Sequence, residues 1–316
     1  MDEFHLIRRY FGSHPLTRDD VVLGIGDDAA LFAVPAGHEL AATVDAQLVD
    51  VHFPAGLDAA AVGHRALAVS MSDLAAMGAQ PAWALLALTL PHADEEWLQK
   101  FSGGFFALAG RHDVTLAGGN MARGPMNITV TALGFVPAGK ALTRGGAEPG
   151  DRIYVTGHPG DAAAGLKLIQ SRKADIKDPC VQRFAFPEPR VGEGTALRGL
   201  ASAAIDVSDG LLADLGHLLE ASGAGASIEI EKLPLSKRLL ELHGKDKGRE
   251  LALTGGDDYE LCFTVPETKA VAVEENLKKL KCPVTRIGRV DAMRGVRCRD
   301  EEGKEMTFAI PGYRHF

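Results

Sequence analysis

In the first half of the chain, apolar runs bounded by Gly, Pro or Asp alternate with stretches that have helical spacing. Short apolar runs rich in branched residues predict β-strands. Four such runs lie at residues 38–46, 82–90, 114–117 and 127–136. Helices are predicted at 57–77 and 93–111, the second because apolar residues recur at helical spacing after Pro91. The predicted order is strand, helix, strand, helix, strand, strand.

The second half repeats this alternation after a segment rich in Pro and Gly at 137–150, which predicts a crossing between domains. The second domain opens with a predicted strand at 151–156. Its predicted helices lie at 161–170 and 211–221, and its later strands lie at 204–207, 227–230, 261–265 and 284–290. This pattern predicts a mixed α/β (α+β) fold with two domains, residues 1–138 and 149–316.

Composition narrows the classes of function. The 316 residues carry a formal net charge of −8, which offers no general attraction to nucleic acid or to an anionic membrane. Any phosphate must therefore be bound by groups close to it, and we expect that phosphate to belong to a small molecule. The charged amino terminus does not resemble a secretory signal, and the most apolar run, 82–90, is too short to span a bilayer, so we expect a cytoplasmic location. The four scattered cysteines predict neither a zinc site nor disulfides, and we expect buried or half-buried thiols.

Acidic residues gather beside glycines and strand ends. The first pair, Asp27 and Asp28, lies in GIGDDAALF, where adjacent like charges need a cation, backbone N–H donors or water to compensate them. Further members of this set are Asp45, Asp73, Asp206, Asp209, Asp257 and Asp258. Because Asp is also a common turn residue and helix cap, a purely structural role explains any single one equally well.

Asp73 strengthens the collective interpretation. In the predicted helix 57–77, the positions three and four residues away are Val69, Ser70, Ala76 and Met77, so this carboxylate lies on or beside the apolar face. An unpaired charge there is costly. Asp45 follows the apolar run LAATV and raises the same difficulty. Magnesium ions held by oxygen ligands, with a phosphate completing the coordination, would resolve both.

Three glycine-rich pieces are predicted loops that suit an anion, at residues 116–124, 142–150 and 155–165. The third leads from a strand into a helix whose amino terminus suits a phosphate, although such a turn is more often structural. Arg144 is a candidate clamp for a nucleotide phosphate, against the alternative of a solvated linker arginine. Neither a P-loop nor a kinase-type glycine loop occurs, so ATP would be bound through metals.

The order and spacing of several segments resemble the thiamine-monophosphate kinase family over nearly the whole chain. The segments are GIGDDAA, VDAQLVDVHF, ALAVSMSDLAAMGAQPAW, LTRGGAEPGDRIYVTG, AIDVSDGLLADLGH, LTGGDDYELCFTVP and GYRHF. The resemblance implies a homodimer in which the amino-terminal sheets of two subunits close a barrel. It also implies a separate carboxy-terminal α/β domain, with the ATP site between the domains.

Carried over by position, the resemblance implies a set of site residues. The magnesium ligands would be Asp28, Thr43, Asp45, Asp73, Asn120, Asp206 and Asp209, with Asp27 beside them. The residues that contact ATP would be Gly119, Arg144 and Ser208, and those that face thiamine monophosphate would be His52, Asp257 and Tyr313. Without the resemblance, His52 would be interpreted as a surface histidine and Tyr313 as a packing residue.

Three positions depart from the family's usual pattern. Asn120 stands where the family generally has a metal-binding aspartate, and it keeps a carbonyl oxygen but lowers the negative charge of the site by one. Val44 stands where a hydroxyl residue is common, and Asp257 is shorter than the usual glutamate by about one methylene. The number of magnesium ions and the affinity for substrate are therefore left open.

The reaction that the resemblance implies is transfer of the ATP γ-phosphoryl group to thiamine monophosphate, giving thiamine diphosphate and ADP. A phosphate monoester has a second pKa of about 6, so the nucleophile is already anionic and needs no general base. Positioning and charge neutralisation by Mg²⁺ would carry the catalysis. Two alternatives remain: another ATP-dependent reaction of the same superfamily, such as activation of an amide oxygen, and a catalytically weakened nucleotide-binding paralogue.

Overall fold

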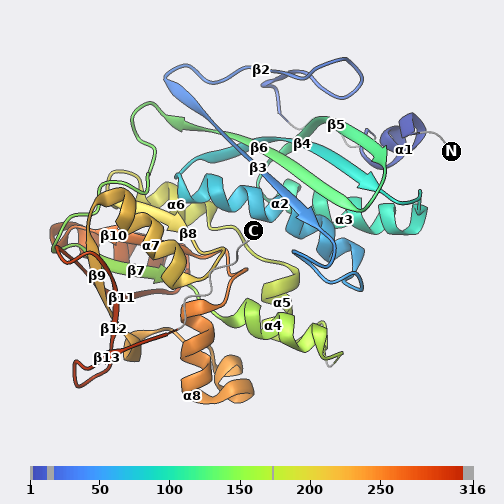
Figure 1. The fold of residues 1–316 in the computed structure, drawn as a ribbon. Helices are drawn as coiled ribbons and strands as arrows, with labels where there is room; N and C mark the ends of the chain where they lie inside the picture. The colour runs from blue at the N-terminus through green and yellow to red at the C-terminus, as the bar shows by residue number, and fades with distance from the viewer. Residues whose placement is uncertain (1–2, 13–17, 173, 309–316) are drawn as a thin grey trace. The chain divides into compact units, whose positions relative to one another are not determined.

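The computed structural model describes residues 3–12, 18–172 and 174–308 (Figure 1). The chain forms two compact units. The first comprises Met1–Leu74 and Ala79–Gly139, and the second comprises Ala75–Gly78 and Lys140–Phe316.

The first unit is built on a four-stranded mixed sheet. Its elements are α1 (Glu3–Tyr10), β1 (Val21–Leu23), β2 (Leu31–Phe32), β3 (His38–Leu48), α2 (Ala59–Ala76), β4 (Gln80–Leu90), α3 (Glu95–Arg111), β5 (Thr115–Arg123) and β6 (Asn127–Pro137). The strand order is β3-β6-β4-β5, with β4 and β5 parallel and the other neighbours antiparallel. The predicted order of two helices and four strands from β3 to β6 is confirmed.

Strand alternation decides which face of this sheet meets the helices. Along β6, buried positions such as Ile128 and Val130 alternate with half-buried ones. Helices α2 and α3 cover the buried face (Figure 1), and the Ser70 hydroxyl of α2 donates a hydrogen bond of 3.1 Å to the Val130 carbonyl. Because Asp45 pairs with Val130 across the strands, the side chains of Asp45 and Thr43 point toward α2. The sheet therefore carries the predicted metal ligands to the helix-covered face.

The prediction of a loop at 116–124 is wrong, because most of this segment belongs to strand β5. Its glycines permit close strand packing instead. Gly119 has a φ of 152°, and a Cβ there would lie 1.9 Å from the Leu86 carbonyl oxygen of β4. A glycine inside a strand can mark such a backbone approach rather than a break in the sheet.

The second unit contains a seven-stranded sheet with the order β13-β12-β9-β11-β7-β10-β8. Its strands are β7 (Arg152–Thr156), β8 (Ala203–Asp206), β9 (Gly225–Glu229), β10 (Leu261–Val265), β11 (Val284–Asp291), β12 (Gly295–Arg299) and β13 (Glu305–Met306). Its helices are α4 (Asp161–Gln170), α5 (Pro179–Ala185), α6 (Val191–Leu197), α7 (Leu211–Ser222), α8 (Lys237–Thr254) and α9 (Ala270–Lys279), with short 3₁₀ turns at Ile230–Lys232 and Glu267–Lys269.

Helices pack on both faces of this sheet. Ile153 and Val155 of β7 belong to a buried cluster with Leu215 of α7, whereas the intervening Tyr154 packs in a second cluster with Leu277 of α9. The unit is thus a mixed α/β layer structure, as the sequence predicts. Helix α8 is absent from the predicted elements because it is largely polar and has a non-helical kink at Gly244, with a φ of 70°.

The structure also bears on the cysteines and on the search for a membrane span. All four cysteines are free and buried, which confirms the prediction of buried thiols; burial raises the pKa of Cys282 to about 12 and that of Cys298 to about 11. Within residues 3–12, 18–172 and 174–308, no helix has both the length and the apolar character that a membrane span requires.

Candidate active site

The first group of site residues joins β3 to α2. The Thr43 hydroxyl of β3 donates a hydrogen bond of 2.5 Å to the Asp73 carboxylate of α2. Asp45 is half-buried on the same face, and its Oδ2 is buried with no hydrogen-bond partner among the described residues. A carboxylate oxygen in this state is costly to bury, so the group has unused capacity to hold a ligand.

The electrostatics of this group favour a cation. Burial and the nearby charge of Asp73 together raise the pKa of Asp45 to about 6, against the opposing effect of a hydrogen bond from Ser70. All the donor atoms are carboxylate or hydroxyl oxygens. Hard divalent cations such as Mg²⁺ take ligands of this kind, and the unpartnered Asp45 oxygen fits that role.

Val44 does not weaken this group through its side chain. Successive side chains of a strand point to opposite faces, so Val44 lies on the face away from Thr43 and Asp45. It is 62 % exposed. A hydroxyl at this position would point away from the Asp45 and Asp73 carboxylates of its own chain, and the substitution leaves their contacts unchanged.

A second group lines a cavity of about 860 Å³ in the first unit. The turn 24–30 and the β5 residues 118–121 form part of its wall, together with apolar residues of α1 and β4. Asp27, Asp28, Gly119 and Asn120 are thereby brought around one cavity. The Asp28 N–H donates a hydrogen bond of 2.8 Å to the Asp27 carboxylate, and both side chains are exposed. The volume lies in the range of about 300–1,000 Å³ that small-molecule sites occupy.

His52 follows β3 in a tight turn. Its Nδ1 accepts a hydrogen bond of 3.0 Å from the Leu48 N–H, and its carbonyl oxygen accepts one of 3.5 Å from the buried Arg65 guanidinium. An Nδ1 that accepts from a backbone N–H carries no proton, so the neutral ring bears its proton on Nε2. His52 is half-buried, and backbone groups fix its orientation. A histidine that lay on the surface without a role would not need such contacts.

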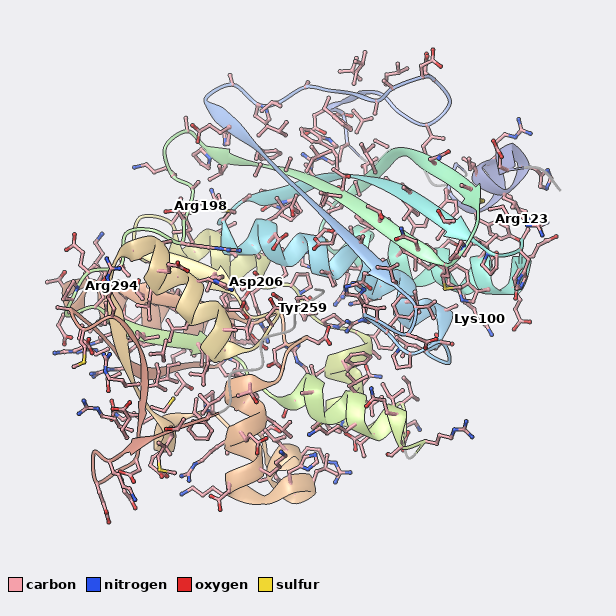
Figure 2. All side chains as sticks on the ribbon, viewed as in Figure 1. Lys100, Arg123, Arg198, Asp206, Tyr259 and Arg294 are labelled. Carbon is pink, nitrogen blue, oxygen red and sulfur yellow. The ribbon has the colours of Figure 1, made fainter. Side chains whose placement is uncertain are left out.

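In the second unit, Asp206 ends strand β8 and is followed by the predicted site residues Ser208 and Asp209 (Figure 2). The loop is held by Asp214 of α7, whose Oδ2 accepts backbone N–H bonds from Ser208, Asp209 and Gly210 at 3.0, 3.0 and 3.1 Å. Burial raises the pKa of Asp214 to about 7. Asp214 thereby fixes the backbone of this loop, and the Ser208 hydroxyl and the Asp209 carboxylate are its candidate ligand groups.

Asp257 lies beside this loop. Its N–H donates a hydrogen bond of 2.8 Å to the Ser208 carbonyl, and the Tyr259 N–H donates one of 2.8 Å to the Val207 carbonyl. These bonds extend the pairing of β10 with β8 past the ends of both strands. The structure therefore brings together the predicted substrate contact Asp257, the predicted ATP contact Ser208 and the predicted metal ligand Asp209.

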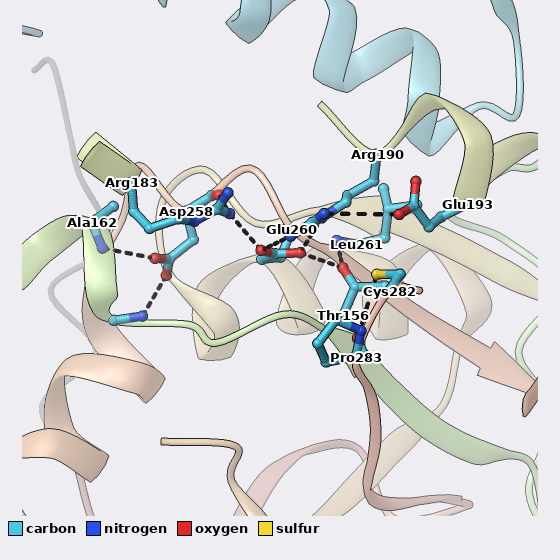
Figure 3. Close-up of polar contacts among 11 residues, drawn as sticks. Thr156, Ala162, Arg183, Arg190, Glu193, Asp258, Glu260, Leu261, Cys282 and Pro283 are labelled. Carbon is cyan, nitrogen blue, oxygen red and sulfur yellow. Dashed lines mark hydrogen bonds and ion pairs between the residues drawn. The ribbon is translucent and has the colours of Figure 1, made fainter. Parts of the chain in front are cut away.

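The glycine-rich turn before α4 does not offer a free phosphate site. The N–H groups of Gly160 and Ala162 donate to the Asp258 carboxylate at 2.8 and 3.3 Å (Figure 3). Burial raises the pKa of Asp258 well above its usual value, against the opposing hydrogen bonds of these two N–H groups and the charge of Arg183. The helix amino terminus is thus capped from within the protein, which supports the structural interpretation of this turn.

Two predicted residues remain, Arg144 and Tyr313. Arg144 is exposed, and its carbonyl oxygen accepts a hydrogen bond of 3.0 Å from the Ser222 hydroxyl. Tyr313 lies outside the described residues. Within the part of the chain that the structure describes, no three His, Cys, Asp or Glu side chains gather as a metal centre. Of the predicted ligands, those from Asp28 to Asn120 belong to the first unit, and Asp206 and Asp209 belong to the second.

Three residues of the site region escaped the sequence interpretation as functional candidates: Arg183, Asp214 and Glu260. Asp258 belongs to the acidic set that the sequence indicates, and Asp214 lies in the helix after the SDG turn. A carboxylate in the first turn of a helix that follows a glycine is a signal for capping, and it would have indicated Asp214. No local pattern could indicate Arg183, whose partners lie more than seventy positions away.

Comparison with known proteins identifies the family. The family models described as AIR synthase related protein, N-terminal domain and C-terminal domain, match residues 26–136 and 148–301. Over 318 residues the chain is 48 % identical to the thiamine-monophosphate kinase of Escherichia coli (strain K12), covering 99 % of this chain and 98 % of that protein. This chain belongs to the thiamine-monophosphate kinase family.

Solved structures of thiamine-monophosphate kinases share the fold. The crystal structure of the enzyme from Stenotrophomonas maltophilia K279a matches with a TM-score of 0.89 at 46 % identity, over 97 % of this chain and 98 % of that one. A structure of AaThiL complexed with AMPPCP and TMP matches with a TM-score of 0.79 at 33 % identity, over 90 % and 89 % of the two chains. The resemblance to thiamine-monophosphate kinases and the mixed α/β two-domain fold are confirmed.

Proposed function

We propose that this protein is a thiamine-monophosphate kinase, which transfers the γ-phosphoryl group of ATP to thiamine monophosphate and releases thiamine diphosphate and ADP. Family membership over the whole chain supports the reaction. The structural observation that carries the proposal is the Asp45 Oδ2, which is buried near the charge of Asp73 and has no hydrogen-bond partner among the residues that the structure describes. An oxygen-only group of this kind suits the divalent cation that accompanies a nucleotide triphosphate.

Magnesium is the cation we propose. The residues that would hold it are Asp28, Thr43, Asp45, Asp73, Asn120, Asp206 and Asp209, with Asp27 shaping the turn beside Asp28. Bound Mg²⁺ would supply neutralisation of the charge that spreads over the transferring phosphoryl oxygens. Asn120 contributes a neutral carbonyl oxygen where an aspartate would add a charge, so its position would bind a cation more weakly.

The chain's own groups position the two substrates. We assign Gly119, Arg144 and the Ser208 hydroxyl to ATP. We assign Asp257, Tyr313 and the Nε2–H of His52 to thiamine monophosphate, since a neutral donor can bind the phosphate without neutralising the nucleophile. No residue acts as general base, because the attacking phosphate oxygen is already anionic at neutral pH.

We assign residues 1–138 to ATP and magnesium binding and to dimerisation, and residues 149–316 to the second α/β domain. We further propose a cytoplasmic homodimer in which the first-unit sheets of two copies close a barrel. Three apolar side chains on the face of β3 opposite α2 support an apolar contact there: Leu40 is 50 % exposed, Val44 62 % and Leu48 38 %. The acidic net charge of −8 supports small-molecule partners rather than nucleic acid.

The test is turnover by the purified protein with ATP, Mg²⁺ and thiamine monophosphate, following thiamine diphosphate by chromatography, with free thiamine as the parallel acceptor. We expect product from the monophosphate alone. Turnover of a different acceptor in a panel would overturn the assignment in favour of another ATP-dependent reaction. ATP binding with no acceptor consumed would identify a weakened paralogue, and Asn120→Asp would then be the variant expected to restore turnover.

A further inference from the structure

The segment that carries Asp257 has an unusual backbone. Asp257 and Tyr259 have φ values of 67° and 51°, in the left-handed region that residues other than glycine rarely adopt. Such residues persist only where their surroundings fix them, and they cluster at functional sites. The Tyr259 hydroxyl also donates a hydrogen bond of 3.1 Å to the Asp257 carboxylate. Something must hold this segment in place.

One side of the segment is held by backbone pairing with residues 207 and 208. The other side is held by two buried carboxylates. Asp258 is 1 % exposed and caps α4, and Glu260 is 0 % exposed at the start of β10. Glu260 accepts a 2.6 Å hydrogen bond from the Thr156 hydroxyl. Both acidic residues lie directly beside the residues with positive φ.

Arg183 of α5 joins these two anchors (Figure 3). Its Nη2 donates to the Asp258 carbonyl at 3.1 Å and to the Glu260 carboxylate at 2.5 Å. Although burial acts to raise it, the charges of Arg183 and Arg190 lower the pKa of Glu260 below its usual value. The guanidinium therefore holds a backbone carbonyl and a buried anion at once, on both sides of Tyr259.

We propose that Arg183 is a positioning residue for the phosphate acceptor, acting through the backbone of residues 257–260 to set the place of the Asp257 carboxylate. This inference rests on the proposed function, in which Asp257 contacts thiamine monophosphate. Loss of Arg183 frees the Asp258 carbonyl and relaxes the strained segment. The acceptor then loses its contact, whereas the backbone of the proposed ATP contact Ser208, although it is paired with Asp257, is held separately by Asp214 and keeps its place.

Arg190 provides a matched control. Its Nε and Nη2 each donate to Glu260 at 2.6 Å, so it makes two hydrogen bonds to this carboxylate where Arg183 makes one. Its hydrogen bonds within this network do not include the Asp258 carbonyl (Figure 3). Arg190→Gln therefore perturbs the same buried anion without removing the contact that the proposal depends on.

The kinetic test compares Arg183→Gln with Arg190→Gln. We expect Arg183→Gln to raise the KM for thiamine monophosphate about tenfold or more, the loss expected for a charged hydrogen bond, with the KM for ATP changed by less than about twofold. Arg190→Gln should change the KM for thiamine monophosphate by less than about threefold. This should hold even if the urea midpoint of Arg190→Gln falls as much as that of Arg183→Gln. Equal effects of the two variants on the acceptor KM overturn the proposal, because the network would then act only through stability.

Hydrogen exchange gives a readout that does not need activity. The Asp257 and Tyr259 amides should exchange faster in Arg183→Gln than in Arg190→Gln, and equal rates contradict the proposal. If wild-type protein turns over no thiamine monophosphate, the proposed function fails. The exchange comparison still tests whether Arg183 holds the backbone of residues 257–260. If Arg183→Gln does not fold, Arg183→Lys replaces it with the same expected selectivity; if neither folds while Arg190→Gln does, Arg183 serves folding and the positioning role is wrong.

Discussion

Asp214 allows the link between a buried carboxylate and nucleotide binding to be tested directly. Replacement by alanine removes one oxygen that accepts three backbone N–H bonds, at 3.0, 3.0 and 3.1 Å. The residue is 3 % exposed, so water cannot readily replace that acceptor. A lost helix cap costs about 1 kcal/mol, and each further buried donor left without a partner costs about 1 kcal/mol or more. We expect Asp214→Ala to lower the free energy of unfolding by about 3 kcal/mol.

The functional consequence concerns the loop that Asp214 holds. Ser208 and Asp209 would lose their fixed backbone, so we expect a higher Kd for ATP in Asp214→Ala. Asp214→Asn keeps an acceptor oxygen of the same shape and should lose only about 1 kcal/mol. The assays are urea unfolding followed by circular dichroism, and ATP titration in calorimetry. An Asp214→Ala protein as stable as wild type, with unchanged ATP affinity, would refute this account of the loop.

Three further predictions follow from the same structure. Asp45→Asn removes a partly buried charge, so the melting temperature should hold or rise while turnover at saturating Mg²⁺ falls about a hundredfold or more; retained turnover contradicts the ligand assignment. Gly119→Ala places a Cβ 1.9 Å from the Leu86 carbonyl oxygen and should destabilise by about 2 kcal/mol or more, whereas Gly103→Ala, with open space around it, should stabilise by about 0.5–1 kcal/mol in urea unfolding. The lowered pKa of Glu260 means that its stabilisation is complete above the unfolded pKa and is lost as pH falls through the folded one, so Glu260→Gln should unfold with a shallower dependence on acid than wild type.

Elements with a strong alternating or helical pattern could be predicted from sequence. Strand β6 alternates buried and half-buried residues along its length, and its predicted and observed bounds differ by one residue at one end. Helix α8 could not be found this way, because it is largely polar and its buried residues are divided by the kink at Gly244, so they form no continuous apolar stripe. The predicted strand at 114–117 covers only the start of β5, because local propensity counts Gly118 and Gly119 as breakers while the neighbouring β4 requires glycine there.

The candidate site divides in the same way. Residues on one short stretch, such as Asp206 and Asp209, could be placed together from sequence because the strand that ends there fixes them. The contact between Thr43 and Asp73 joins positions thirty residues apart, and it could be expected only as a shared need for a cation. The buried partners of Glu260 come from separate elements and leave no periodic signal in the sequence.

At two helix amino termini, carboxylates of the protein already accept the backbone N–H bonds. This supports the proposal that an acidic protein would bind a triphosphate through metals. In the second unit, the backbone donors before α7 are given to Asp214, and those at the start of α4 are given to Asp258. Free N–H groups at helix amino termini commonly bind phosphate groups in proteins. Because carboxylates of the protein already occupy them, a bound triphosphate must be neutralised by other positive charge. In the proposed function, cations held by aspartates would supply that charge, with Asp28 as a ligand and Asp27 beside it, so that the acidic pair would not be an unfavourable repulsion.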